Sequence, residues 1–131
     1  MNDGQPQQVT AYQLMGEEGI RALVDAFYDR MDLEEAFADI RKLHPESLDG
    51  SRDKLYWYLT GWLGGPSLYI ERFGHPRLRA RHLPFPIAEK ERDQWLACMR
   101  MAMHDVKMPA DLSAALMDAM SGVADWMRNR E

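Results

Sequence analysis

Residues 64–87 read GGPSLYIERFGHPRLRARHLPFPI, and three glycines and four prolines divide this segment into short pieces. Glycine and proline both interrupt regular helices. Their positions leave room for only one or two helical turns, around residues 78–82. Because an irregular segment of this length within a domain usually serves a function, we expect part of the functional site here.

Before this segment, apolar residues repeat at the spacing of helices. The stripe within residues 20–31 predicts a long first helix. A second stripe, within residues 37–43, predicts a shorter helix that ends near His44, because a proline follows that residue and disfavours helical geometry there. A third helix is expected to be capped by Asp49 or Ser51 and to end at the paired glycines.

After this segment, two further stripes predict two more helices. The first lies within residues 95–106, and the second, within residues 112–127, begins at Pro109, which suits the first turn of a helix. Strand-type alternation is nowhere convincing, so the predicted fold class is all-α. The length of 131 residues is that of one domain. We expect a flexible N-terminal tail over residues 1–10 and a single domain over residues 11–131.

The composition disfavours several classes of protein. The formal net charge of −5 disfavours nucleic-acid binding, and the short basic run at residues 77–82 fits a small anion better. A single thiol, Cys98, allows neither an internal disulfide nor a multi-thiolate metal site. Residues 1–13 lack the features of a secretory signal, and no uncharged run is long enough to span a bilayer. These features predict a cytoplasmic protein with no nucleic-acid or membrane partner.

Four histidines are the candidate metal ligands and general bases: His44, His75, His82 and His104. None has the H-x-x-x-H or H-E-x-x-H spacing of zinc hydrolases. His104 fits a surface position at a helix end, where the helix dipole stabilises a cation. Tyr28 and Trp95 lie on or beside apolar stripes, and each carries a donor that needs a buried partner. That partner is either a bound ligand or a backbone carbonyl, and the pattern alone favours the carbonyl.

Several ordered blocks of the sequence closely resemble the group II truncated haemoglobins. The blocks are GGPSLY at 64–69, GHPRLRARHLPFPI at 74–87 and ERDQWL at 91–96. The resemblance extends upstream through GIRALVDAFY at 19–28 and LHP at 43–45, and it covers residues 11–128. It departs from the family pattern at Met15-Gly16, where the family has a glycine pair. The resemblance implies a truncated globin fold, which is a two-over-two helical sandwich around haem b with an extended proximal loop.

For the proximal side, the resemblance implies that His82 is the iron ligand and that His75 is its neighbour in the motif. A neutral imidazole suits haem iron, and flanking prolines can hold its ring in place. Lys54, Arg79 and Arg81 are implied to pair with the haem propionates, which would be the small anion expected for the basic run. The remaining implied haem contacts are Leu55, Leu59, Tyr69, Leu78, Phe85, Trp95 and Met99.

For the distal side, the resemblance implies that Tyr28, His44 and Trp95 surround the gaseous ligand. Their O–H and N–H groups offer three donors, and donors that stabilise bound O₂ slow its release. Ser51 is implied to occupy the place where vertebrate globins keep a distal histidine, and its small side chain would leave a gate.

The function that the resemblance implies is binding of O₂ and other diatomic ligands, such as NO and CO, at ferrous iron. A donor-rich distal site favours redox chemistry, such as nitric oxide dioxygenation, over oxygen transport or storage. That chemistry needs an electron donor, which the sequence does not identify. The protein is expected to be a monomer or a weak homodimer.

Two alternatives stay open. A peroxidase-like or sulfide-binding haem protein would use His44 as an acid–base group and Tyr28 or Trp95 as oxidisable side chains. A haem-free helical interaction module would need only amphipathic stripes, which any globin also has.

Overall fold

The computed structural model describes residues 9–129, which form helices joined by turns and loops, with no strand in that range. Along the chain the helices are α1 (Ala11–Leu33), the 3-10 helix η1 (Glu35–Phe37), α2 (Ala38–Arg41), α3 (Asp49–Trp62), α4 (Leu68–Phe73), α5 (Leu78–His82), α6 (Glu89–Asp105) and α7 (Ala110–Trp126). The predicted all-α class is confirmed. Most of the predicted tail, residues 1–8, lies outside the described residues.

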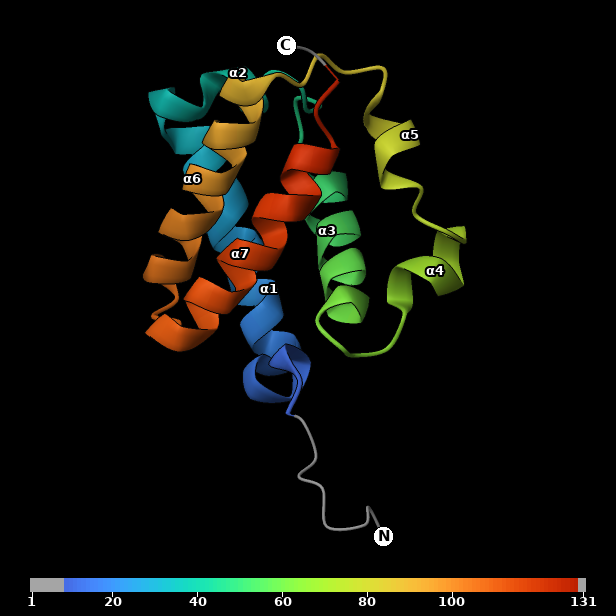
Figure 1. Ribbon diagram of the computed structural model, residues 1–131, viewed down its shortest axis with the longest axis vertical. Helices are drawn as coiled ribbons and strands as arrows, with labels where there is room; N and C mark the ends of the chain where they lie inside the picture. The colour runs from blue at the N-terminus through green and yellow to red at the C-terminus, as the bar shows by residue number, and fades with distance from the viewer. Residues whose placement is uncertain (1–8, 130–131) are drawn as a thin grey trace, which may run out of the picture.

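The helices form two pairs that stack on each other. Helix α1 packs against α3, α6 packs against α7, and α1 and α6 make the contact between the pairs. Helix α4 packs on α3, whereas α5 stands at one edge of the molecule (Figure 1). This arrangement is the predicted two-over-two sandwich. Within the described range, no helix has both the length and the apolar character needed to cross a membrane.

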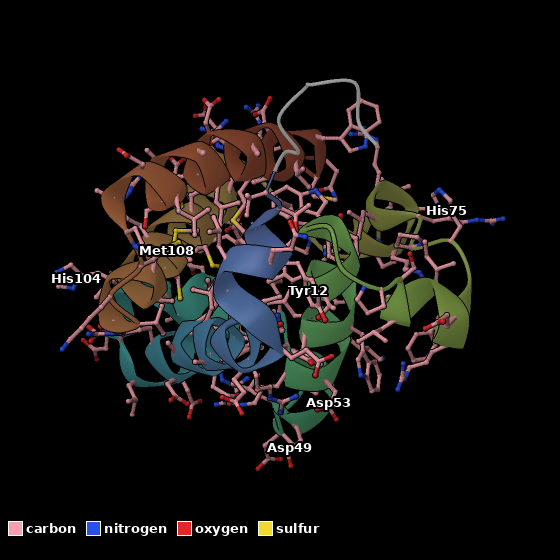
Figure 2. All side chains as sticks on the ribbon, turned by 90° about the horizontal axis from the view of Figure 1, so that it is seen from below. Tyr12, Asp49, Asp53, His75, His104 and Met108 are labelled. Atoms are coloured by element: carbon pink, nitrogen blue, oxygen red, sulfur yellow. The ribbon has the colours of Figure 1, made fainter. Side chains whose placement is uncertain are left out.

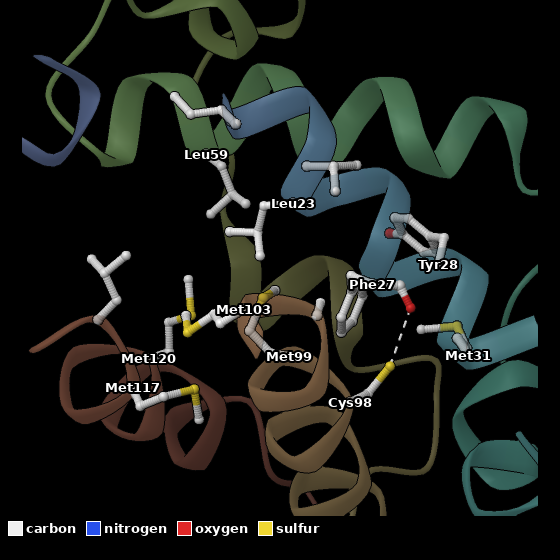
Figure 3. Close-up of a cluster of buried hydrophobic side chains, with 14 of the residues drawn as sticks. Leu23, Phe27, Tyr28, Met31, Leu59, Cys98, Met99, Met103, Met117 and Met120 are labelled. Atoms are coloured by element: carbon white, nitrogen blue, oxygen red, sulfur yellow. Dashed lines mark hydrogen bonds between the residues drawn. The ribbon is translucent and has the colours of Figure 1, made fainter. Parts of the chain in front are cut away.

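The core lies where α1 meets α6 and α3 (Figure 3). The fully buried residues of α1 are Ile20, Leu23, Val24 and Phe27. Their partners on α6 are Cys98, Met99, Ala102 and Met103. The Cys98 thiol donates a hydrogen bond to the carbonyl oxygen of Phe27 over 3.1 Å. Residues spaced three or four apart on each helix make this contact, as the periodicity predicts.

Helix α1 begins earlier than the sequence indicates. The hydroxyl of Thr10 accepts a hydrogen bond from the backbone N–H of Gln13 (3.1 Å), and the Gln13 side chain accepts one from the N–H of Thr10 (2.9 Å). This capping box makes Thr10, which the sequence assigns to the tail, the N-cap of α1. At Gly16 the backbone adopts φ 71° and ψ 170°, so a short first segment joins the long helix at a kink.

Helix α4 is absent from the sequence prediction, whereas the predicted turns around residues 78–82 are confirmed as α5. Contacts with its own next turn and with α3 stabilise α4. The rings of Tyr69 and Phe73 lie 4.9 Å apart, and the ring of Tyr69 lies 6.4 Å from that of Tyr58. Tertiary packing of aromatic rings therefore forms a helix that the short apolar pattern does not predict.

The start of α3 also differs from the prediction. Neither Asp49 nor Ser51 caps the helix, because both lie inside it. The N-cap is Leu48, which has no side-chain hydrogen bond to offer but is only 7% exposed. A buried apolar residue thus occupies the N-cap of α3, and the hydroxyl of Ser47 accepts from the N–H of Asp49 over 3.3 Å.

Gly64→Ala is expected to destabilise the protein. Gly64 has φ 103°, which residues with a side chain rarely adopt, and a Cβ there would lie 2.7 Å from the Cβ of Thr10. We expect the free energy of unfolding, measured by urea denaturation, to fall by about 1–3 kcal/mol. Gly50→Ala in α3 is the matched control, because a Cβ at Gly50 would meet no atom within 4 Å. Equal stability of the two variants would contradict the prediction.

Candidate functional site

Helix α5 ends at His82, whose ring nitrogen Nδ1 lies 2.6 Å from the carbonyl oxygen of Leu78, one turn earlier. Because a carbonyl can only accept a hydrogen bond, Nδ1 carries the proton and Nε2 keeps its lone pair. Among residues 9–129, no group forms a hydrogen bond with Nε2. His82 is therefore held in the tautomer that a metal ligand needs.

His75 and His104 lie far from each other and are both exposed. Figure 2 shows them pointing outward on opposite sides of the molecule. The Nδ1 atom of His75 accepts a hydrogen bond from the backbone N–H of Arg77 (3.1 Å). This bond supports the left-handed conformation of Arg77 (φ 47°), from which α5 begins. His75 thus contributes to the local geometry before α5.

A cavity of about 440 Å³ lies between α3, the segment that leads into α5, and α7. It is lined by Tyr58, His75, Pro76, Arg77, Leu78, Gly122, Val123 and Trp126. Leu78 and His82 are four residues apart on α5, so they share one face of that helix. The cavity is largely open to solvent, and none of Tyr28, His44, His82 and Trp95 lines it. The sequence predicts Leu78 here, but it does not predict Tyr58, Val123 or Trp126.

Two of these three lining residues lie on the apolar stripes that the sequence analysis identifies. Tyr58 lies on the apolar stripe of α3 and Val123 on that of α7. A stripe shows which face of a helix is apolar, but it does not show whether that face meets another helix or a cavity. Trp126 lies at the edge of the stripe of α7 and is 64% exposed, so periodicity does not mark it as a lining residue.

Tyr28, Trp95 and His44 are brought together by Phe27. The ring of Phe27 lies 5.0 Å from that of Tyr28 and 5.2 Å from that of Trp95. The ring of Tyr28 in turn lies 5.7 Å from that of His44 in an edge-to-face contact. Residues from α1, from α6 and from the loop after α2 therefore form one aromatic cluster.

The hydroxyl of Tyr28 and the indole N–H of Trp95 have no hydrogen-bond partner among residues 9–129. In the same part of the chain, no fully buried side-chain nitrogen or oxygen lacks a partner. Neither donor atom is therefore fully enclosed by protein atoms. Burial raises the pKa of Tyr28, so its phenol keeps the proton that it would donate. The site thus presents two free donors from adjacent helices.

His44 differs from the expectation of a third donor. Its Nδ1 lies 2.8 Å from the carbonyl oxygen of Ile40 and must therefore donate to it. Burial lowers the pKa of His44, the hydrogen bond to the Ile40 carbonyl opposes this shift, and the charge of Arg41 lowers the pKa slightly further. The ring is then neutral near pH 7, and Nε2 is an acceptor. The Nε2 atom of His44 becomes a donor only when the ring is protonated.

Gln94 fixes the position of the Ile40 backbone, and the sequence does not predict it. The side-chain oxygen of Gln94 accepts a hydrogen bond from the N–H of Ile40 (3.3 Å), and its amide nitrogen donates to Asp39 (2.7 Å). Because the Ile40 carbonyl binds His44, Gln94 links α6 to the orientation of that ring. No sequence signal marks this role, because glutamines on exposed helix faces are common.

Arg52, next to Ser51, is a second residue that the sequence does not predict. Its guanidinium donates to the carboxylates of Asp25 (3.0 Å) and Asp29 (2.8 Å) and lies 5.9 Å from the ring centroid of Tyr28. Ser51 itself is half-buried at the start of α3. Arg52 therefore ties α3 to the segment of α1 that carries Tyr28.

Three of the residues predicted to contact propionates or haem lie along one edge of α3, α4 and α5. The guanidinium of Arg81 lies 5.9 Å from the ring of Tyr69, and the Nζ of Lys54 lies 6.0 Å from the ring of Phe73. Tyr69 and Phe73 contact each other. Arg79 lies elsewhere, because it donates to the carbonyl oxygen of Trp126 over 2.7 Å.

The remaining predicted haem contacts differ in burial. Leu59 and Met99 are buried in the core cluster, at 3% and 0% exposure (Figure 3). Leu55 is partly buried against that cluster, and Phe85 is 40% exposed in the loop after α5.

The stability of the protein is expected to depend on pH through His44. Burial lowers its pKa in the folded state below the ordinary value of 6.5, so below that pH the unfolded chain binds a proton that the folded protein does not. The stabilisation present above pH 6.5 is lost as the pH falls through the folded-state pKa. Urea denaturation of wild type and His44→Phe from about pH 7.5 to 5 measures this. The wild type should lose more stability on acidification, and a pH-independent difference would contradict the prediction.

Comparison with known proteins places this geometry in a family. Residues 10–129 match the bacterial-like globins. The group 2 truncated hemoglobin YjbI of Bacillus subtilis is 40% identical over 119 residues, which cover 91% of this chain and 88% of that protein.

Solved structures agree with this match. The group II 2-on-2 hemoglobin of Agrobacterium tumefaciens superposes with a TM-score of 0.91 at 42% identity, over 97% of this chain and 99% of that one. A truncated oxygen-avid haemoglobin from Bacillus subtilis superposes with a TM-score of 0.85 at 39% identity, over 92% of this chain and 100% of that one. The chain therefore belongs to the bacterial-like globins, as a group II truncated haemoglobin, a family that binds small gaseous ligands at a haem.

Proposed function

We propose that this protein holds haem b with His82 as the iron ligand and binds O₂ and other diatomic ligands beside Tyr28 and Trp95. The observation that carries the proposal is a pair of donors without a partner among residues 9–129, the Tyr28 hydroxyl and the Trp95 N–H, on rings that both pack against Phe27. The free Nε2 of His82 supports the iron ligand, because its partner nitrogen is already bonded to Leu78.

When bound, haem b would supply a ferrous iron that binds O₂ and transfers partial negative charge to the O₂. Tyr28 and Trp95 donate hydrogen bonds toward that charge, and both rings pack against the buried ring of Phe27. Neutral His44 contributes an acceptor, because its Nδ1 donates to the Ile40 carbonyl and its Nε2 keeps a lone pair. Donors in a site with little water stabilise developing negative charge more than they would in solution.

The haem propionates would lie at the edge formed by Lys54, Tyr69 and Arg81. The two cations and the phenol lie along α3, α4 and α5, next to aromatic rings that leave their polar ends in solvent. A guanidinium is a strong partner for a carboxylate because it can donate two parallel hydrogen bonds.

Slow release of O₂ favours redox chemistry on it, and nitric oxide dioxygenation to nitrate is the reaction that we assign. The similarity to an oxygen-avid haemoglobin supports slow release. An external electron donor would return the iron to its ferrous state. The single buried thiol, Cys98, fits a reducing compartment such as the cytoplasm.

The haem assignment is tested by optical spectra of the purified protein in oxidised, reduced and carbon monoxide-bound forms. Wild type is expected to hold one haem and to bind carbon monoxide, whereas His82→Ala should lose haem or the five-coordinate ferrous spectrum. The control His104→Ala replaces an exposed histidine on the opposite side of the molecule from His75 and should keep both. A wild type without specific haem uptake would overturn the proposal and favour a helical interaction module.

The role of Trp95 is tested by stopped-flow measurement of O₂ dissociation. A hydrogen bond to a charged partner is worth about 1.5–3 kcal/mol, so Trp95→Phe should speed release by roughly 10- to 150-fold. Trp62→Phe is the matched control, because Trp62 is the last residue of α3 and lies outside the aromatic cluster. Release in wild type as fast as in Trp95→Phe would contradict a role in chemistry on bound O₂. Nitrate formation from NO and O₂ should decline in the same variant.

A further inference from the structure

Helix α5 has little apolar packing to hold it. None of its residues is buried, and it has no extensive contact with another helix in the described part of the chain. A segment with few buried contacts opens easily unless hydrogen bonds restrain it. The last carbonyl groups of any helix also lack partners within the helix. The carbonyl oxygen of His82 accepts from the N–H of Phe85, just after the helix, over 3.0 Å. The position of His82 otherwise depends on contacts from segments farther along the chain.

Asn129 supplies such contacts from the far end of the chain. Its side-chain amide nitrogen donates to the carbonyl oxygens of His82 (3.2 Å) and Phe85 (2.9 Å). Its side-chain oxygen accepts from the backbone N–H of Ile87 (3.0 Å), and its own N–H donates to the carbonyl of Ile87 (2.8 Å). Figure 1 shows the end of α7 running beside the connection between α5 and α6.

Two further features make this connection firm. Ile87 is 9% exposed, so the residue that pairs twice with Asn129 is itself anchored. Arg79 on α5 donates to the carbonyl oxygens of Trp126 (2.7 Å) and Arg128 (3.3 Å), and its guanidinium lies 5.1 Å from the ring of Trp126. The C-terminal end therefore bonds α5 at two places, before and at His82.

We propose that Asn129 is a positioning residue for His82, which holds the end of α5 so that the imidazole meets the iron in one orientation. The proposal rests on the proposed function, in which His82 ligates haem. The ring of His82 is bonded to Leu78 within α5, so it moves together with that helix. A shift of the His82 carbonyl is thus transmitted to Nε2.

Asn129→Asp removes the amide donor of the side chain while keeping its size. Aspartate keeps an oxygen that can accept from Ile87, but it replaces the amide N–H₂ that faces two carbonyl oxygens with a second oxygen. Arg128→Ala is the matched control, because the Arg128 side chain is directed to Glu89 and Asp125 while its carbonyl remains available to Arg79.

The readouts are the iron–histidine stretching band of the ferrous protein in resonance Raman spectra and the rate of haem transfer to excess apomyoglobin. In Asn129→Asp, the band should shift or broaden and haem loss should accelerate roughly tenfold, as expected for the loss of two hydrogen bonds of modest net strength. Arg128→Ala should match wild type in both. An unchanged band and loss rate in Asn129→Asp would overturn the proposal.

A measurement on the wild type covers the case in which the variant fails to fold. Hydrogen exchange of the Ile87 and Asn129 amides should be slow with haem bound, because both N–H groups are bonded within this connection. Rapid exchange of both would overturn the proposal. Failure of the proposed function is distinguishable. If His82 does not ligate haem iron, the wild type shows no iron–histidine band that depends on His82.

Discussion

The packing of α1 against α6 around Phe27 is the constraint on which the distal half of the site depends. Phe27 is fully buried, and its carbonyl oxygen accepts a hydrogen bond from the thiol of Cys98. Burial raises the pKa of Cys98 to about 12, so the thiol stays protonated and remains a donor. Tyr28 follows Phe27 on α1, and Trp95 lies three residues before Cys98 on α6. Any sliding of the two helices would therefore separate the two free donors.

The two halves of the site are held by different forces. Apolar packing holds the distal residues, and it is independent of whether a cofactor is present. Hydrogen bonds hold the proximal residues, because prolines and glycines limit α5 to five residues and leave it no buried side chain. The proximal segment is therefore the half that can open locally, which suits a place where a large planar cofactor must enter.

Polar residues around the aromatic cluster determine which protons are available. Gln94 and Ile40 orient His44 through its Nδ1, so its neutral ring offers an acceptor. Arg52 lies near the ring of Tyr28 while it binds two carboxylates, which keeps its positive charge partly compensated. The distal site thus combines two donors with one acceptor.

Much of the fold followed from the sequence alone, because apolar periodicity is a local property of each helix. The stripes predicted the long helices, and the glycines and prolines of residues 64–87 predicted the irregular segment between α3 and α6. The family resemblance, borne by those residues and by the blocks around Tyr28 and Trp95, identified the haem-binding family. Periodicity did not predict α4, because aromatic contacts with α3 stabilise that helix.

Only the tertiary structure decided the tautomer of His44, the partners of Arg79 and the contacts of Asn129. These features depend on carbonyl groups, which every residue carries and which no sequence pattern distinguishes. Arg79 and Trp126 are 47 positions apart, as are Asn129 and His82. The sequence by itself determined the long helices and the family that the chain resembles, because both depend on patterns of neighbouring residues. The folded chain decided which donors are left free, because a donor stays free only when no distant segment brings an acceptor within hydrogen-bond distance.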